Sequence, residues 1–527
     1  MEPVTSTAYL QPAVKIDEKP DTEYTKSMRR QFPLFSIGCL LYSAFYAFCL
    51  YRNASGITYP FFAAGTLCCF FFFMKKLGIP MKKNSVFYIV SISLLGLSNC
   101  MTASLPILFM NKCGIFLLFF VLILHTVYDD KEWNFPKYFC AIFRTLGGVF
   151  SCLLRPFGDM VSYFDARKQE KETKKNYFLP ALIGFSIAVP ILFFVTLLLA
   201  SADVVFEHML SDLINILNLF SAIRIFFLMT VVFFSSYAIV SALCKKEVKE
   251  KTEEKTGFDA VIAIVITSLL CLVYMAFSTV QILYLFIGNM ELPKNYTYAH
   301  YAREGFFQLL TVSIINFLIV LICLHLFQES KILRIILTMI CGCTFIMILS
   351  SALRMILYIE SYSLTFLRLF VLWALAVIFF LMAGVTAYIF YRRFPLFFYG
   401  LSVVTVFYIA LSFSHPDYVV ARYNLTTVPF DYQYEPPASC DSPEGYRVMY
   451  YDIDYLSSLS ADAAPAILNP SVNPDLISVA DMLEKTSMDY YNLYWIKDYY
   501  RKIEKLTECL GIRNFNFSLY RAKKYIQ

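Results

Sequence analysis

Long apolar stretches separated by short polar segments make up most of this chain. Eleven of them are long enough to cross, as a helix, the roughly 30 Å of hydrocarbon in a membrane. The predicted spans are residues 33–51, 57–74, 85–104, 106–127, 178–200, 220–243, 258–287, 306–327, 335–358, 364–390 and 394–413. Because residues 335–390 are too long for one span, we predict a turn at residues 360–363, with Ser363 capping the returning helix.

One long segment, residues 128–177, interrupts this series. Its first part, residues 136–159, places Arg144 and Arg155 at wide intervals among Phe, Leu and Ile. That pattern predicts an amphipathic helix lying in the membrane surface. Its second part, residues 165–176, is an unbroken polar and charged run, which we interpret as a solvated linker.

Positive charge alternates between successive predicted loops, and cytoplasmic loops are the ones enriched in Lys and Arg. With the N-terminus inside, the basic residues of the cytoplasmic loops are Lys75, Lys76, Lys82, Lys83, the cluster within 128–177, Lys245, Lys246, Lys249, Lys251, Lys255, Lys331, Arg334, Arg392 and Arg393. The predicted outward loops contain few basic residues. An odd number of spans then puts the C-terminus outside.

The predicted fold is all-α, a polytopic transmembrane helical bundle of about eleven spans with a small, mostly α-helical external C-terminal domain. Its parts are a cytoplasmic N-terminal tail (1–32), a four-span N-terminal membrane region (33–127), the cytoplasmic amphipathic helix and charged linker (128–177), a seven-span membrane core (178–413) and an extracytoplasmic C-terminal domain (414–527). In the last part, residues 450–459, 475–484 and 488–508 have helical periodicity. Its two cysteines, Cys440 and Cys509, form either a disulfide or two free thiols.

The composition excludes a soluble protein of this length. The chain is 58% hydrophobic and only 16% charged, which is too little charge to cover the surface of a soluble chain. The net charge of +6 comes from residues in short loops between spans, so it indicates topology and not nucleic-acid binding. We expect membrane lipids as partners and leave a protein partner in the envelope or cytoplasm unspecified.

Candidate chemistry lies at the predicted outward ends of the spans. The richest segment, YTYAHYAREGFFQ at residues 296–308, leads directly into a span. Ionisable residues beside hydrocarbon are costly, so such a cluster needs a partner, a cavity or a function. The candidate ligand-binding or structural polar cluster is Asp203, Glu207, Arg224, Tyr298, Tyr301, Arg303, Glu304, Gln308, Arg354, Glu360, Arg368 and Arg422.

Helical spacing puts Tyr301, Glu304 and Gln308 on one face of the span that follows. Arg354 and Arg368 are predicted at similar depth on neighbouring helices, where two guanidinium groups need carboxylates or an anionic ligand. Three interpretations stay open. Salt bridges to Glu360, Glu304 or Asp203 would lock the helix ends, a polar cavity would bind an anionic ligand or lipid headgroup, or Glu304 or Asp203 would couple protons or ions. Arg422 either docks the tail, with Glu304 as one candidate partner, or packs within the tail.

The sequence contains no recognised catalytic, nucleotide-binding or metal-binding motif. His208, His300, His415 and Glu207 do not approach a known ligand spacing. We therefore predict no metal and no cofactor, and the sequence gives little support to an enzymatic activity.

Five passages carry a resemblance to a known family. They are LLLASADVVFE (197–207), YTYAHYAREGFFQLL (296–310), RMILYIESYSLTFLRLF (354–370), HPDYVVARYN (415–424) and YDIDYLSSLSADAAPAIL (451–468). They resemble the domain-of-unknown-function 4173 family of bacterial polytopic membrane proteins, which is related to family 4153. The resemblance implies a multi-span core with an external tail in the bacterial cytoplasmic membrane, and it assigns no catalytic residues. Ser363 stands where the family pattern has Gly, and His415 where it has Asn.

Three classes of function follow from these patterns. The favoured one is a structural, regulatory or sensing membrane protein with an outward-facing polar site. A transporter of a small or anionic solute is the alternative, although the charges crowd the outer ends and no inverted repeat is visible. An envelope-modifying transferase is the third, without a motif to support it.

Overall fold

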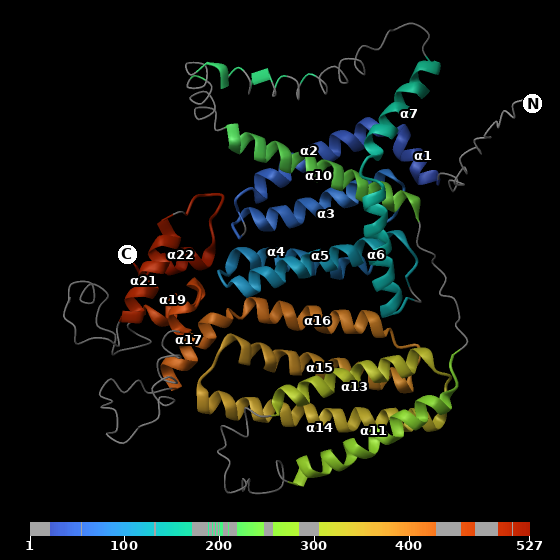
Figure 1. Cartoon of the computed structure of the whole chain (residues 1–527), viewed down its shortest axis with the longest axis vertical. Coiled ribbons are helices and arrows are strands. Elements are labelled where there is room, and N and C mark those ends of the chain that lie inside the picture. The colour runs from blue at the N-terminus through green and yellow to red at the C-terminus, as the bar shows by residue number, and fades with distance from the viewer. Residues whose placement is uncertain are drawn as a thin grey trace, which may run out of the picture. The chain divides into compact units, whose positions relative to one another are not determined.

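The computed structural model of the chain is built from helices throughout the part that it describes (Figure 1). That part comprises residues 22–53, 55–130, 133–170, 219–246, 257–283, 305–427, 455–469, 494–508 and 510–526, with scattered positions between 188 and 209. The helices are α1 (Glu23–Arg30), α2 (Phe32–Leu50), α3 (Thr58–Lys76), α4 (Ser85–Met101), α5 (Leu105–Val127), α6 (Phe135–Ser151), α7 (Arg155–Glu170), α10 (Leu219–Lys245), α11 (Ala260–Gln281), α13 (Phe306–Leu326), α14 (Lys331–Tyr362), α15 (Phe366–Phe390), α16 (Leu396–Phe413), α17 (Pro416–Thr427), η2 (Ala461–Ala463), α19 (Ala464–Ile467), α21 (Tyr494–Glu508) and α22 (Phe517–Lys523).

Nine helices of the described part are long and apolar enough to cross a membrane, and ten are if the bent pair α6–α7 forms one span. The nine are α2, α3, α5, α10, α11, α13, α14, α15 and α16, whereas α4 is shorter at 17 residues. These helices confirm the predicted all-α, multi-pass membrane class. The predicted span at 178–200 is described only at scattered positions, and the predicted helix at 475–484 lies outside the described residues. The count of eleven spans therefore stays a prediction.

The segment after α5 is not the single amphipathic helix predicted for residues 136–159. It forms α6 and α7, which are separated by a turn at residues 152–154 and bent by 60°. Pro156 explains the break, because proline fits the first turn of a helix but does not continue a preceding one. Helix α7 then continues to Glu170, so the first residues of the predicted solvated linker are helical.

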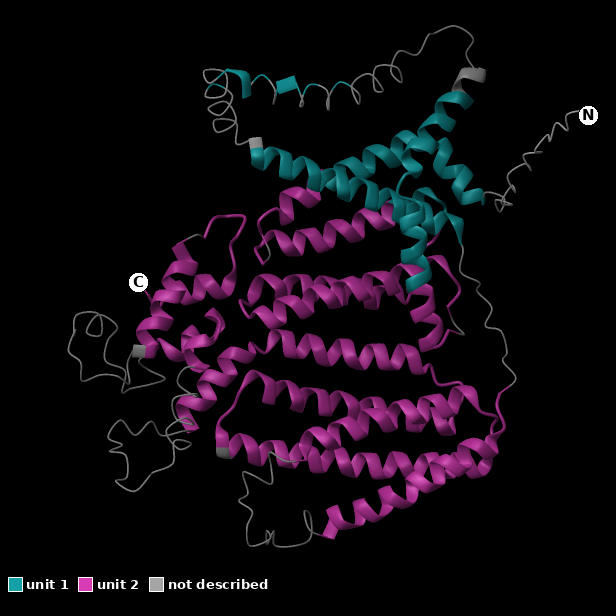
Figure 2. Cartoon of the chain, viewed as in Figure 1, with its two compact units in different colours: residues 1–43, 73–78, 143–248 teal, residues 44–72, 79–142, 249–527 magenta. Residues whose placement is uncertain are grey.

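The chain divides into two compact units (Figure 2), which comprise residues 1–43, 73–78 and 143–248 in unit 1, and residues 44–72, 79–142 and 249–527 in unit 2. In unit 1, helices α1, α7 and α10 pack on one another around the buried carboxylate of Asp159. This carboxylate accepts hydrogen bonds from Arg29 Nε at 2.9 Å and from the Tyr237 hydroxyl at 3.0 Å. One buried acid therefore joins three helices.

Unit 2 is a series of packed helices in the order α5, α4, α16, α15, α14 and α11, with α13 against both α14 and α15 (Figure 1). Their apolar faces meet in a core that includes Val320, Ile340, Met382 and Val385. Successive connections lie at opposite ends of the series. We call the end with residues 82–84, 128–130, 324–329 and 391–395 the basic end, and the end with residues 102–104, 363–365 and 414–415 the tail end.

The described C-terminal residues pack on the tail end of unit 2. Leu456, Ile467, Trp495 and Tyr499 belong to the same apolar core as Ile359 of α14. Helix α21 lies within the helix predicted at 488–508, but the sequence pattern did not predict α17 or α22. Both are short helices, of 12 and 7 residues, whose stability depends on this packing.

Candidate functional site

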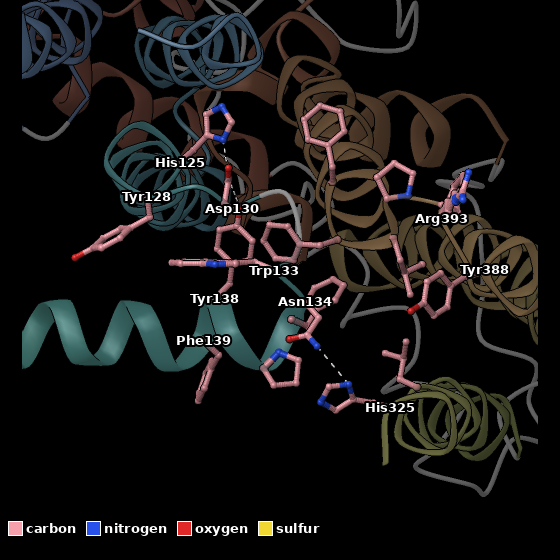
Figure 3. Close-up of a pocket in the computed structure, with 18 of the residues that line it drawn as sticks. His125, Tyr128, Asp130, Trp133, Asn134, Tyr138, Phe139, His325, Tyr388 and Arg393 are labelled. Carbon is pink, nitrogen blue, oxygen red and sulfur yellow. Dashed lines mark hydrogen bonds and ion pairs between the residues drawn. The ribbon is translucent and has the colours of Figure 1, made fainter. Parts of the chain in front are cut away.

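A large pocket opens at the basic end of unit 2 (Figure 3), with a cavity volume of about 1640 Å³. Connections that are far apart in the sequence meet there, and the charge pattern predicts all of them on one side of the membrane. Among the described residues, its charged lining has four cationic and two acidic side chains, which are Lys82, Lys83, Arg392, Arg393, Asp129 and Asp130. We call this cavity the basic pocket.

Asp130 organises the loop between α5 and α6. Its carboxylate accepts hydrogen bonds from His125 Nδ1 at 2.6 Å and from the Tyr138 hydroxyl, and it lies 3.5 Å from Lys82 Nζ. Burial alone would raise the pKa of Asp130, but the hydrogen bonds from His125 and Tyr138 and the nearby charges of His125 and Lys82 outweigh burial and lower it. Asp130 is therefore ionised at neutral pH, and its charge is balanced by these neighbours.

Aromatic rings form one wall of the basic pocket. The ring of Tyr138 stacks on Phe397 with centroids 3.8 Å apart, and Trp133 meets Tyr138 edge-on at 5.1 Å. Beside them, the Asn134 amide bonds His325 Nδ1 at 3.3 Å. Figure 3 shows Trp133, Asn134 and Tyr138 between His125 on one side and Arg393 on the other.

The four cations of the pocket differ in whether they have ion-pair partners among the described residues. Lys82 bonds Asp130 and the Tyr128 carbonyl, and Arg392 Nε lies 2.8 Å from Glu329. Lys83 and Arg393 are exposed, and neither has an ion-pair partner within the described residues. Two exposed cations thus line the pocket, and Asp129 is an exposed acid in its described lining.

A second polar site lies at the tail end of unit 2, and unlike the basic pocket it is closed. It consists of Asp417, Asp462 and the groups that bond them, and we call it the aspartate site. Asp462, in η2, is 5% exposed. Its carboxylate accepts hydrogen bonds from the Ala103 N–H at 2.8 Å and from the hydroxyls of Thr102 and Ser518, and His415 Nδ1 lies 3.4 Å away. The site therefore joins the α4–α5 turn, the start of α17, η2 and α22.

The two carboxyls of the aspartate site differ in acidity. Burial raises the pKa of Asp417, and the charge of Asp462 raises it further, against opposing hydrogen bonds that include the Ser460 N–H at 3.3 Å. Burial alone would also raise the pKa of Asp462, but hydrogen bonds from His415, Ser518, Thr102 and Ala103 lower it. Asp462 is therefore the stronger acid of the pair, and Asp417 takes up a proton more readily.

Several predicted site residues lie outside the described part of the chain, namely Glu207, Tyr298, Tyr301, Arg303 and Glu304. His208, His300, Cys440 and Cys509 do too. The predicted Tyr301–Glu304–Gln308 face is therefore described only at Gln308, which is exposed in the first turn of α13.

Among the described residues, Arg354 and Arg368 each donate hydrogen bonds to uncharged oxygens, whereas the predicted partner Glu304 lies outside the described part. Arg354 is 7% exposed and donates to Gln281 Oε1 at 3.3 Å. Its guanidinium also packs on Gly305, where an added Cβ would lie 2.5 Å from Nη1. Arg368 donates to the carbonyls of Tyr362 and Ser363 and lies 4.3 Å over the Tyr358 ring, so it caps the C-terminus of α14.

The other described candidates do not come together in one site. Glu360 is exposed at the end of α14, and Arg422 is exposed on α17, where it donates to the Tyr418 hydroxyl at 3.2 Å. Asp203 and Arg224, in unit 1, are exposed as well. Tail contacts instead involve Asp462 and Asn424, whose side chain bonds the N–H and the carbonyl of Leu364 at 2.8 and 2.9 Å.

The residues of both sites were visible in the sequence, but their roles were not. Lys82, Lys83, Arg392 and Arg393 served only as signals of topology, although aromatic residues follow or flank them in the same loops. Asp417 and Asp462 lie in two of the passages quoted above, without an assigned function. Within the described residues, no group of three or more His, Cys, Asp or Glu side chains could hold a metal ion.

Comparison with known proteins places the chain in one family. The model of a domain of unknown function, DUF4153, matches residues 89–469, which is more than half of the chain. The match spans Asp130, Arg392, Asp417 and Asp462, and therefore parts of both sites. Searches of curated proteins and of solved structures each found no match. The chain belongs to the DUF4153 family, whose domain has no known function.

Proposed function

We propose that this multi-pass membrane protein has a binding and regulatory role, and that its ligand is an anion held in the basic pocket. The observation that carries this proposal is a cavity of about 1640 Å³ whose described lining has four cationic side chains against two acidic ones. A concave site with an excess of one charge concentrates ligands of the opposite sign.

Binding fits the pocket better than catalysis does. Its titratable groups His125, Asp130 and Tyr138 bond one another and hold the α5–α6 loop. A general base must reach its substrate, whereas Asp130 and Tyr138 bond each other, His125 Nδ1 bonds Asp130, and His125 Nε2 is buried.

A regulatory role also fits the interior better than transport does. The Asn111 side chain accepts from the Tyr408 hydroxyl at 2.7 Å and from Ser412 at 2.8 Å, and Asn316 donates to Thr344 at 2.9 Å. Polar side chains that bond one another between neighbouring spans favour a packed bundle over a polar route through the membrane. We therefore propose the basic pocket, and not the predicted outward-facing cluster, as the sensing site.

The proposal includes the bacterial cytoplasmic membrane as location and kinship with the related 4173 family, both of which rest on the five quoted passages. The basic end then faces the cytoplasm, as the distribution of Lys and Arg predicts.

Thermal unfolding of the full chain in a neutral detergent tests the proposal with two probes, inorganic pyrophosphate and dodecyl phosphate. At saturation, at least one probe should raise the unfolding midpoint by several degrees, because a ligand that binds only the folded state stabilises it. The double variant Lys83→Gln/Arg393→Gln should lose this response, whereas Lys331→Gln, an exposed cation at the same end but outside the pocket, should keep it. The proposal fails if neither probe shifts the midpoint, or if the double variant responds like the parent.

A further inference from the structure

We infer that the anion is a phospholipid headgroup, held by Lys83 and Arg393, and that the acyl chains leave the basic pocket over an apolar rim formed by α6 and α13. This inference rests on the proposed function and names the ligand class for the same site. A membrane phospholipid is distinguished from a free phosphate by the surfaces that it would cover.

The apolar rim is the first observation. Phe139 of α6 is 65% exposed, and Leu318 and Ile322 of α13 are each 49% exposed. All three line the cavity, and α13 is one of the membrane-spanning helices. The wall of the pocket therefore continues from charged side chains to the hydrocarbon-facing surface of a span. A soluble anion would leave that rim uncovered, whereas an acyl chain would bury it.

The size of the cavity is the second observation. Pockets for small soluble ligands typically have volumes of about 300–1,000 Å³. The basic pocket measures about 1640 Å³, which leaves room for a headgroup and the upper part of its chains. A single phosphate or pyrophosphate would occupy a small fraction of it.

The position of the charges and aromatic rings is the third observation. Trp133 and Tyr138 line the pocket beside the cations, and these residue types prefer the interface between headgroups and hydrocarbon. Basic pockets between transmembrane helices on the cytoplasmic side suit anionic lipids, which are enriched in that leaflet. The charge pattern predicts the basic end on that side.

Photo-labelling of the full chain tests the inference. The chain is placed in nanodiscs of phosphatidylcholine mixed with a phosphatidylglycerol that carries a diazirine on its acyl chain, and the labelled peptides are identified by mass spectrometry. Label should appear on peptides containing Phe139 or Ile322. A phosphatidylcholine with the same diazirine should label them far less.

Matched variants identify the contacts. Lys83→Gln and Arg393→Gln should each reduce phosphatidylglycerol labelling about fivefold, the usual effect of one basic residue near an anionic lipid surface. Lys331→Gln should leave it unchanged. Ile322→Asn should reduce labelling by placing an amide where the chain would lie.

The outcomes separate the two sources of phosphate. If pyrophosphate raises the unfolding midpoint while the two lipids label equally, the ligand is soluble, and the lipid inference falls while the proposed function stands. If neither the midpoint shift with the phosphate probes nor the labelling by phosphatidylglycerol depends on Lys83 and Arg393, the lipid inference and the proposed function both fail. Labelling that requires the phosphatidylglycerol headgroup and is reduced in the Lys83 and Arg393 variants supports the lipid inference and the proposed function.

Discussion

Replacing Asp462 with alanine should detach the C-terminal segment from the bundle and leave the spans folded. The buried carboxylate accepts hydrogen bonds from Ala103, Thr102 and Ser518, which connect three parts of the chain. A hydrogen bond to a charged group contributes about 1.5–3 kcal/mol, but bonds to a shared acceptor do not add fully. Breaking a buried charged network from one side costs about 3–5 kcal/mol.

We therefore expect a loss of about 4 kcal/mol in the free energy that holds the tail, and roughly half of that for Asp462→Asn, which keeps the volume and one acceptor oxygen. Since every 1.4 kcal/mol is a factor of ten, Asp462→Ala should raise the detached population roughly a thousandfold. If the free energy that holds the tail in the parent is below about 4 kcal/mol, the tail of the variant should be detached most of the time.

Amide hydrogen exchange with mass spectrometry on the full chain in detergent measures this opening. Exchange at residues 461–468 should accelerate by a factor of roughly one hundred to one thousand, while α13 to α15 exchange as before. Asp498→Asn removes an exposed carboxylate from α21 and should change neither region. An acceleration below about fivefold at 461–468, or equal acceleration in the spans, would refute the role of Asp462 as the attachment point.

Three further predictions concern the same end of unit 2. The raised pKa of Asp417 gives a stabilising contribution that is present at low pH and lost as pH rises through that pKa, whereas the lowered pKa of Asp462 gives one that is lost as pH falls through it. The thermal midpoint of the tail should therefore peak near the ordinary Asp pKa of 3.8, and Asp417→Asn should abolish the decline above that pH; a flat parent profile would contradict the opposed shifts. Ser363→Gly should raise the unfolding midpoint by a few degrees, since Ser363 has φ 68° and ψ 171°, a region that costs a side chain about 1–3 kcal/mol; an unchanged or lower midpoint would show that the serine hydroxyl compensates for this strain. Gly305→Ala should destabilise by about 2 kcal/mol or more in denaturant unfolding, because φ is 103° and the new Cβ would lie 2.5 Å from Arg354 Nη1; parent-like stability would mean that Arg354 moves aside freely.

Hydropathy was sufficient to predict the spans, because the length of an apolar run is a local property. Helix α5 begins and ends within a residue of the predicted 106–127, and α14 and α15 turn back at residues 363–365, next to the predicted position. The details of that turn depended on backbone conformation. Thr365, not Ser363, caps α15 by accepting from the Arg368 N–H.

The two departures from the family pattern turned out to mark special backbone positions. Ser363 has φ 68° and His415 has φ 48°, in the region that Gly and Asn adopt most easily. These positive φ angles give a backbone reason to expect Gly or Asn at the two positions, which the sequence alone did not offer.

Neither polar site could be predicted from local patterns. Asp462 bonds a turn 360 residues away, and the basic pocket requires four connections to meet at one end of the bundle. Charge alternation predicted that these connections share a side of the membrane, but not that they enclose a cavity. Local patterns also did not predict that Arg354 and Arg368 bond amide and carbonyl oxygens. Their pairing with a carboxylate such as Glu304, or with an anionic ligand, stays a prediction.

The tail end of unit 2 holds a buried carboxylate that needs hydrogen-bond donors, whereas the basic end holds cations that need acceptors. This difference favours a bound ligand at the basic end. At the tail end, a buried carboxylate finds its donors in backbone N–H and hydroxyl groups of segments that fold onto it, so the site closes. At the basic end, cations need acceptors, and a wall of aromatic and aliphatic side chains supplies few. The acids that are present satisfy Lys82 and Arg392, and leave Lys83 and Arg393 exposed in the pocket lining. Since an anionic headgroup supplies acceptors and an acyl chain covers the rim, a phospholipid would complete the basic end as the C-terminal segment completes the tail end.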